Sequence, residues 1–298
     1  MKLKQLVNKA KNKKNFADLK GFIAFCSEYL NYISDNLQAT IVSQNENHYR
    51  FYQYRKEGNF QITRPINSNL MYEAEVFSKI SKEFLKILRS IKNIDRNDDS
   101  IRQILNNSTY TIQQSVGSAL DGLPAGKSNT ARKLNGDLFE HFIRLIIREI
   151  GIPCNAGVIQ VPVIVEGEPQ FNMSYQHDLI IEKNYEVKVI GSIKTSSKDR
   201  IDKIFIDKFL YNKLTEKATP HIAIFLNDVQ RKNTKRENEY GINATFLPGH
   251  FKGYTVKLNP LDGVYYCDIR PNMRTESILK DHIKTFDNLL IEDIWKFI

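Results

Sequence analysis

The chain of 298 residues has only three cysteines, and these stand far apart, at Cys26, Cys154 and Cys267. Their odd number and wide spacing argue against a disulfide framework and against a CxxC metal site. No apolar run reaches the roughly 20 residues that a membrane-spanning helix requires. The basic N-terminus, MKLKQLVNKAKNKKNF, lacks the long apolar segment of a secretion signal. We therefore expect a protein of the reducing cytoplasm.

Several common catalytic signatures are also missing. The six histidines show neither HxH nor HExxH spacing, and no GxSxG sequence occurs. The sequence therefore offers no simple zinc site and no serine nucleophile at a tight strand-to-helix turn.

Positive charge is abundant. Lysine and arginine number 43 against 34 acidic residues, which gives a formal net charge of +9. Such a surplus is compatible with a polyanionic partner such as nucleic acid. A coding bias toward lysine, asparagine and isoleucine would produce the same surplus without any binding role, so charge alone leaves both explanations open.

Hydrophobic periodicity predicts a mixed α/β (α+β) fold, with a mixed central β-sheet flanked by helices and a mainly helical N-terminal region that contains a β-hairpin. Helices are expected within residues 1–36, 71–91, 101–120, 134–151, 198–214 and 277–298. Strands are expected within residues 40–64, 158–167, 173–182, 185–194, 221–228, 254–258 and 264–269, and a polar loop at 231–239.

The stretch LDGLPAGKSNTARK, at 120–133, is the best candidate for a domain boundary, because it combines glycine, proline and small polar residues. It divides the chain into residues 1–125 and residues 126–298. It also contains Gly126-Lys127-Ser128, which matches the end of a phosphate-binding P-loop. Asp121 stands where that motif needs its first glycine, and no strand leads into it, so the sequence argues against a P-loop.

Residues 176–210 carry the most informative chemistry. A turn near Lys183–Asn184 would pair the flanking strands and bring Asp178 beside Ser192 and Lys194. Ser192 and Lys194 are two residues apart, so their side chains point to the same face. The sequence predicts a carboxylate and an ammonium group at the open end of a hairpin, just before a helix.

This arrangement resembles the PD-(D/E)xK nuclease superfamily, with Asp178 as its first acid and Lys194 as its lysine. The resemblance covers roughly residues 136–228. It departs from the family pattern at His177, which replaces the usual proline, and at Ser192, which replaces the second acid.

A literal ExK sequence, Glu186-Val187-Lys188, is the rival placement. It lies beside the turn, at the closed end of the hairpin, and this position counts against it.

The EcoRII-like and NgoMIV-like restriction endonucleases carry Ser-x-Lys at this place, with the missing acid on the following helix. Asp207 lies thirteen residues after Lys194 and matches that acid, and Asp202 is the competing choice. Glu140 matches a further acid on the preceding helix. The resemblance implies that Asp178 and Asp207 hold Mg²⁺, which favours oxygen ligands, and that Glu140 lies at a second or outer-shell metal site. Lys194 would orient the attacking water or offset phosphate charge.

The same enzymes read bases with a charged pair four and five residues after the lysine, which here falls on Lys198 and Asp199, with Arg200 next. A cationic side chain and a carboxylate can read a G·C pair in the major groove. A charged helix start capped by Asp199 would explain the same residues.

The resemblance therefore implies a type II restriction endonuclease, a sequence-specific Mg²⁺-dependent enzyme that cuts double-stranded DNA at a short G·C-containing palindrome. It also implies a homodimer and a cognate DNA methyltransferase encoded alongside. Residues 126–298 would form the catalytic core, and residues 1–125 would assist DNA binding. The alternatives are a structure-selective repair or junction-resolving nuclease of the same fold and a catalytically inactive DNA-binding protein. In HYRFYQYRK, at 48–56, the alternating aromatic residues either form a packed sheet face or enter the DNA.

Overall fold

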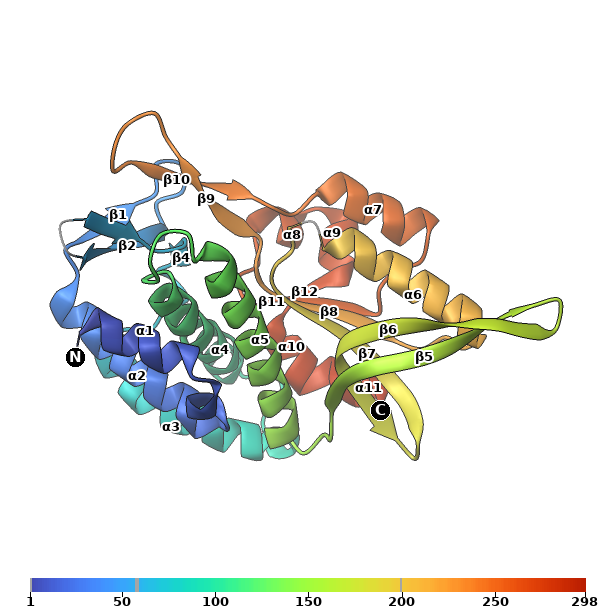
Figure 1. Cartoon of the computed structure of the whole chain (residues 1–298). Coiled ribbons are helices and arrows are strands. Elements are labelled where there is room, and N and C mark those ends of the chain that lie inside the picture. Colours follow the sequence, from blue (N-terminus) through green and yellow to red (C-terminus); the bar gives the residue numbers. More distant parts are fainter. Residues whose placement is uncertain (1, 57–58, 199) are drawn as a thin grey trace.

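The N-terminal region is a bundle of helices beside a small antiparallel sheet. The computed structural model describes residues 2–56, 59–198 and 200–298 (Figure 1). Polar caps set helix starts: Asp18 Oδ1 accepts a hydrogen bond from the backbone N–H of Gly21, and Asp98 Oδ1 accepts one from Ser100. The helices are α1 Leu3–Lys11, α2 Leu19–Asn36, α3 Ala74–Arg89 and α4 Asp99–Leu120, with short 3-10 turns at Lys13–Phe16 and Ile91–Asn93. The strands are β1 Ala39–Val42, β2 Tyr49–Lys56, β3 Asn59–Ile62 and β4 Ile66–Asn67.

The aromatic residues of β2 belong to the interior. Tyr49, Phe51 and Tyr54 are fully buried, and the Tyr54 hydroxyl lies 2.5 Å from that of Tyr29 on α2. Of the two interpretations that the sequence allowed for this strand, packing inside the protein is the one that the structure supports, but it involves both faces: Tyr49 and Phe51 belong to one buried cluster and Tyr54 to another.

A six-stranded mixed sheet forms the other half of the molecule, with the order β12-β11-β8-β7-β6-β5. The pairs β5–β6 and β6–β7 are antiparallel, whereas β7, β8, β11 and β12 run parallel to one another. These strands span β5 Asn155–Val165, β6 Glu168–Lys183, β7 Glu186–Ser196, β8 His221–Asn227, β11 Gly263–Tyr266 and β12 Ile283–Thr285. The predicted fold class, a mixed central sheet flanked by helices, is confirmed.

Helices cover both faces of this sheet. Helix α5 (Ser128–Glu149) packs its apolar side against Ile181 and Ile193 in the main core, and α6 (Ile201–Thr215) packs Tyr211 against Tyr175 and Ile190 on the opposite face. Helix α5 contacts both β6 and β7 on one face of the sheet, and α6 lies on the other face.

The predicted hairpin of β6 and β7 is confirmed. Lys183 pairs with Glu186 beside the turn, and Leu179 pairs with Gly191 toward the open end. Asn184 and Tyr185 both have positive φ angles, of 54° and 64°, as a two-residue type I′ turn requires.

Three predictions of secondary structure are wrong. Residues 254–258 lie in helix α7 (Pro248–Lys257) and not in a strand: Pro248 stands in its first turn, and Phe251 and Thr255 form a buried face four residues apart. The polar loop predicted at 231–239 is wrong over residues 231–233, which belong to β9 (Val229–Asn233), whereas residues 234–239 do form a loop, which joins β9 to β10 (Tyr240–Ala244).

The third wrong prediction is a continuous C-terminal helix over 277–298. Strand β12 interrupts it, because Ile283 pairs with Val264 of β11. The remaining short helical segments are α8 Pro271–Thr275, α9 Ser277–His282, α10 Phe286–Asn288, a π-helical turn Leu289–Asp293 and α11 Ile294–Phe297.

The two halves of the chain share one hydrophobic core. A single cluster of buried side chains extends from Leu6 on α1 through Leu138 on α5 to Ile294 near the C-terminus. Helix α5 begins at Ser128, so only residues 121–127 of the expected boundary segment connect α4 to α5. The division at residue 125 stays a prediction about function. Within the described ranges, no helix combines the length and the apolar character needed to cross a membrane.

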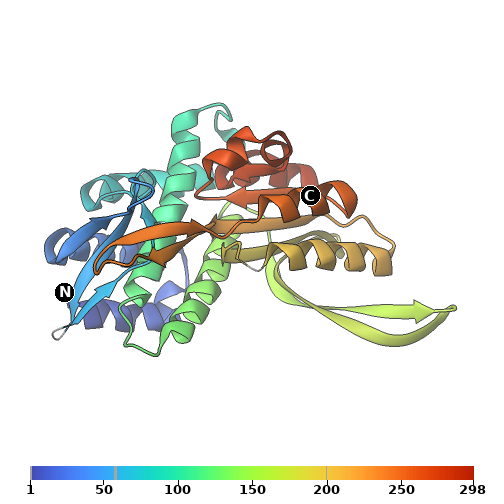
Figure 2. The same ribbon diagram turned by 90° about the horizontal axis from the view of Figure 1, so that it is seen from above.

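Strands β5 and β6 project from the rest of the molecule. The paired ends of β5 and β6 form a long two-stranded ribbon that extends away from the sheet (Figures 1 and 2). Its outer part exposes apolar side chains, with Ile164 and Phe171 each 60% exposed.

Candidate functional site

The candidate site lies where β6 and β7 separate. Their backbone pairing ends at Leu179–Gly191. Asp178, the residue just before Leu179 on β6, contacts β7 through its side chain instead of its backbone. Asp178 Oδ2 accepts a hydrogen bond of 2.8 Å from the backbone N–H of Ile193 on β7. The carboxylate is therefore fixed against the backbone of the strand that carries Lys194.

Lys194 joins two acids at this fork. Its Nζ lies 2.5 Å from Asp178 Oδ2 and 3.1 Å from Glu140 Oε1. Glu140 comes from α5, whose neighbouring Phe139 and Phe142 are fully buried and so hold the helix in place. The structure thus brings together three of the predicted site residues from three different elements.

The electrostatics of this group favour added positive charge. Burial raises the pKa of the Glu140 carboxyl, and the nearby charge of Asp178 raises it further, against the lowering effect of Lys194. The charges of Lys194 and Arg144 both lower this pKa, but they do not outweigh burial and the repulsion between Glu140 and Asp178. A cation bound here would relieve their repulsion.

The donor set fits a magnesium ion held by two carboxylates. Lys194 occupies one oxygen of each acid, and no described residue donates a hydrogen bond to Asp178 Oδ1 or Glu140 Oε2. Mg²⁺ is commonly bound by one or two carboxylates together with water and substrate phosphate oxygens. In the part of the chain that the structure describes, no three acidic, histidine or cysteine side chains are grouped as metal ligands.

Asp207 stands apart from the other three predicted residues. It lies on α6, where it forms an ion pair with Lys203 one turn earlier. Its charge acts on His177, whose pKa is lowered mainly by burial and is raised by the charges of Asp207 and of Asp178. The buried His177 ring thus lies within electrostatic range of both acids. The role of Asp207 as a metal ligand stays a prediction.

The competing acid, Asp202, points toward another part of the molecule. Its Oδ2 lies 3.4 Å from His250 Nδ1 on α7. Asp202 makes no hydrogen bond or ion pair with Asp178 or Lys194, so the structure offers no contact between it and the site.

The rival ExK sequence lies at the closed end of the hairpin. Lys188 Nζ is 2.7 Å from Glu186 Oε2, and Glu186 pairs across the hairpin with Lys183. Four residues of β6 therefore lie between Lys183, the partner of Glu186, and Asp178. Ser192 is half-buried and pairs with Ala223 on β8.

The expected base-reading segment follows the end of β7. Lys198 is exposed, and its Nζ lies 3.3 Å from Gln230 Oε1 on β9. Arg200 is also exposed and stands at the start of α6. Asp199 lies outside the described residues. The segment therefore lies between the site strand and the β9–β10 hairpin.

One residue of the site, Arg144, was not predicted from the sequence. Arg144 lies one helical turn after Glu140 on α5, and its Nη1 donates a hydrogen bond of 2.6 Å to the backbone carbonyl of Asp178. The guanidinium thus fixes the backbone of β6 at the residue that supplies the carboxylate. The i, i+4 spacing from Glu140 is the signal that would have indicated it.

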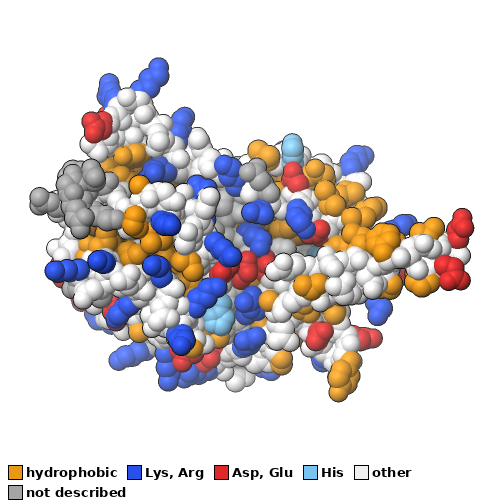
Figure 3. Space-filling view, viewed as in Figure 1, with side chains coloured by type: hydrophobic (Ala, Val, Ile, Leu, Met, Phe, Trp, Pro, Cys, Tyr) orange, Lys and Arg blue, Asp and Glu red, His pale blue; other side chains and the backbone are white. Residues whose placement is uncertain are grey.

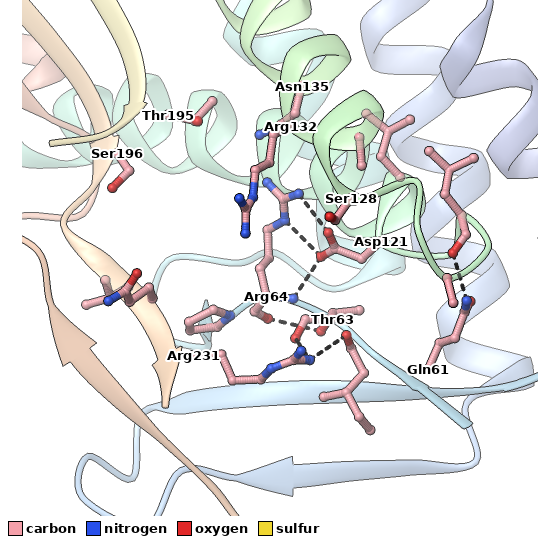
Figure 4. Close-up of a pocket in the computed structure, with 18 of the residues that line it drawn as sticks. Gln61, Thr63, Arg64, Asp121, Ser128, Arg132, Asn135, Thr195, Ser196 and Arg231 are labelled. Atoms are coloured by element: carbon pink, nitrogen blue, oxygen red, sulfur yellow. Dashed lines mark hydrogen bonds and ion pairs between the residues drawn. The ribbon is translucent and has the colours of Figure 1, made fainter. Parts of the chain in front are cut away.

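An open cleft of about 540 Å³ lies beside the site and was not predicted from the sequence. Thr195 and Ser196, which follow Lys194 on β7, form part of its lining, and Arg64, Arg132 and Arg231 line it from other segments (Figure 4). On the face shown in Figure 3, lysine and arginine side chains surround a small acidic patch near the middle of the molecule. No sequence signal unites the three arginines, because they come from distant segments.

Comparisons with known proteins give a likeness in structure only. No known protein-family model matches the chain, and no curated protein sequence matches it. Among solved structures, the chain is similar to the crystal structure of the Type IIP restriction endonuclease Kpn2I, with a TM-score of 0.69 and 18% sequence identity. The similarity covers 99% of this chain and 97% of that chain. The chain therefore has a restriction-endonuclease-like fold along almost its whole length.

Proposed function

We propose that the chain is a type II restriction endonuclease that hydrolyses phosphodiester bonds of double-stranded DNA in a Mg²⁺-dependent, sequence-specific reaction. The observation that carries this proposal is the contact of Lys194 Nζ with both Asp178 and Glu140 at the fork of β6 and β7. The fold shared with a restriction endonuclease supports it. An ammonium group and two acids at one sheet edge match what phosphodiester hydrolysis needs, which is charge stabilisation and an activated water.

The residues of this chain would divide that work. A bound Mg²⁺ supplies positive charge for the phosphate and acidifies water. Asp178 Oδ1 and Glu140 Oε2 would hold the ion, and the Ile193 N–H keeps Asp178 in position. Lys194 Nζ would donate a hydrogen bond to a phosphate oxygen or to the attacking water. Asp207, on α6 beyond His177, is proposed as a further acid of the same site.

Base recognition is assigned to the segment after β7. Lys198 and Arg200 carry exposed cationic side chains suited to the acceptors of guanine, and Asp199 would accept from cytosine N4. We therefore expect a short palindrome that contains G·C pairs. Cut sites without any G·C preference would contradict this assignment.

The proposal includes a homodimer, formed through the β5–β6 ribbon. No lysine or arginine occurs from Glu149 to Glu182, although the whole chain contains 43. Glu166 and Glu168 place acidic charge at the ribbon tip, so the ribbon is unsuited to DNA. Two copies of a chain with net charge +9 can approach best through such a segment, and its exposed apolar side chains would be covered by the second copy.

Digestion of unmethylated phage DNA, with and without Mg²⁺, tests the function. Wild-type protein should yield discrete fragments with Mg²⁺, and Asp178→Ala and Lys194→Ala should yield none. Methylation of the recognised bases should block cutting, as expected if a cognate methyltransferase protects the host. A smear would favour a structure-selective nuclease, and binding without any cutting would favour an inactive DNA-binding protein.

A further inference from the structure

The cleft beside the site is continuous with it through two elements. On α5, Arg132 lines the cleft eight residues before Glu140, which is about 12 Å along the helix axis at 1.5 Å per residue. On β7, Ser196 lines the cleft two residues after Lys194. A ligand that reaches from Arg132 to the acids must therefore be extended. Twelve ångströms corresponds to roughly three or four nucleotides at 3.4 Å per step of one DNA strand.

The charge of the cleft is positive. Its described lining contains three arginines, Arg64, Arg132 and Arg231, and one acid, Asp121, which leaves a formal surplus of two positive charges (3 − 1). Arg64 and Asp121 neutralise each other, because Nε and Nη2 of Arg64 donate to both carboxylate oxygens of Asp121, at 2.9 and 2.8 Å. The surplus therefore resides on Arg132 and Arg231.

Among the described residues, neither of these two guanidinium groups is paired with a carboxylate, so both can bind an anionic ligand. Arg132 is exposed and makes no side-chain hydrogen bond or ion pair with any described residue. Arg231 Nη1 donates a hydrogen bond of 2.8 Å to the Ile62 carbonyl, and the guanidinium lies 5.4 Å from the centre of the Tyr240 ring. Neutral partners thus hold Arg231 in place, and no carboxylate in the described residues offsets it.

The two arginines reach the cleft from different elements. Figure 4 shows Arg132 extending from α5 and Arg231 lying beside Thr63, with the Arg64–Asp121 pair between them. The first turn of α5, with Ser128 at its start, also lines the cleft. The unpaired N–H groups of a helix start favour anions.

We propose that Arg132 and Arg231 bind phosphates of the DNA backbone in this cleft, and that the bound strand runs along α5 toward Glu140 and Lys194. The inference rests on the proposed function and adds to it the residues that hold the substrate. Backbone phosphates are the favoured partner because, within the described part of the chain, Arg132 and Arg231 have no acidic partner, and the one acid of the cleft lining, Asp121, is already neutralised by Arg64. Phosphate contacts of this kind fix the register of the DNA and carry no sequence information.

The test is the salt dependence of binding to a fluorescent 30-bp duplex in EDTA, for wild-type protein and for the Arg132→Ala and Arg231→Ala variants. Each variant should weaken binding by roughly 10-fold near 0.1 M salt, and each should reduce the slope of log K against log salt by about 1. Arg132→Lys and Arg231→Lys should restore most of the affinity, because they retain the charge. Arg89→Ala is the matched control, since Arg89 pairs with Glu149 and does not line the cleft.

The outcomes separate this inference from the function. If wild-type protein binds the duplex and both alanine variants keep its affinity and slope, the cleft assignment is wrong while the proposed function stands. If wild-type protein neither binds nor cuts DNA, both are wrong. If either alanine variant cuts at relaxed sequences, its arginine reads bases, and the backbone assignment is overturned.

Discussion

Lys194 Nζ lies 2.5 Å from Asp178 Oδ2, and the same oxygen accepts the backbone N–H of Ile193. A single carboxylate oxygen thus links the lysine to the backbone of its own strand. This contact fixes the acid and the ammonium relative to each other before any ligand binds. Groups held in this way need little rearrangement when negative charge develops on a substrate.

Glu140 is expected to act through its carboxylate. Glu140→Gln removes one of the two acids at the fork, so the Mg²⁺ concentration needed for half-maximal cutting should rise roughly 10–100-fold. Titration of cutting rate against Mg²⁺ measures this. Asp137→Asn is the control on the same helix, because Asp137 pairs with Lys13 and makes no contact with Lys194. An unchanged requirement in Glu140→Gln would exclude Glu140 from the metal site.

Asp228 is expected to make stability depend on pH. Burial raises its pKa to about 7, the nearby Asp268 adds to the effect, and Arg270 opposes it. Between about pH 4 and 7 the folded state therefore binds more protons than the unfolded state at this group. Its contribution to the free energy of unfolding is fully present below about pH 4 and is lost as pH rises through 7.

In Asp228→Asn, the loss of unfolding free energy that this carboxyl causes as pH rises should be absent. The free energy of unfolding of wild-type protein relative to this variant should fall between pH 5 and pH 8, as urea titrations at the two pH values would measure. A wild-type protein that gains stability relative to the variant over the same interval would show that the carboxyl is not held neutral.

The Arg64–Asp121 pair, which lines the cleft, is expected to be important for the stability of the folded protein. Asp121→Asn leaves the guanidinium of Arg64 without its counter-charge, and each side chain is only 20% exposed. Loss of one partner from a buried pair costs about 3–5 kcal/mol of unfolding free energy. Glu75→Gln, which breaks an exposed pair with Lys79 on α3, should change it by less than about 0.5 kcal/mol. Equal effects in urea unfolding would show that the Arg64 pair is no more important than a surface one.

The β5–β6 ribbon is expected to hold two copies together. Phe171→Glu places charge on an exposed apolar position of the ribbon and should raise the dimer dissociation constant at least 10-fold, as sedimentation velocity would show. Tyr185→Glu is the control, because Tyr185 is fully exposed in the turn at the other end of β6. If the wild-type protein is a monomer, or if both variants dimerise equally, the ribbon is not the interface.

The sequence predicted those parts of the site that local rules determine. A turn at Asn184 pairs β6 with β7 and brings Asp178 to the Lys194 end of β7, although a one-residue register shift between Ile181 and Glu182 was not predicted. Glu140 was predictable because its apolar neighbours determine which side of α5 faces the sheet. The hydrophobic runs of β7 and β8 likewise indicated a buried mixed sheet.

Features that depend on distant segments were not predictable. Arg64, Arg132 and Arg231 meet only because three separate parts of the chain fold around one cleft. Residues 254–258 alternate apolar and polar side chains as a strand does, but the proline at 248 and the packing of Phe251 determine a helix. Strand β12 replaces part of a predicted helix because β11 offers an edge for pairing.

The comparison of two lysines on the same strand tests the proposed site most directly. Lys188 and Lys194 both lie on β7, and each pairs with an acid, but only Lys194 lies at the open end of the hairpin. Single-turnover cutting of a duplex that contains the mapped site should fall at least 10²-fold in Lys194→Ala and remain near the wild-type rate in Lys188→Ala, since the loss of a positioned catalytic group costs on the order of 10²–10⁴. Loss of cutting in Lys188→Ala with retention in Lys194→Ala would place the site at the closed end and contradict the assignment.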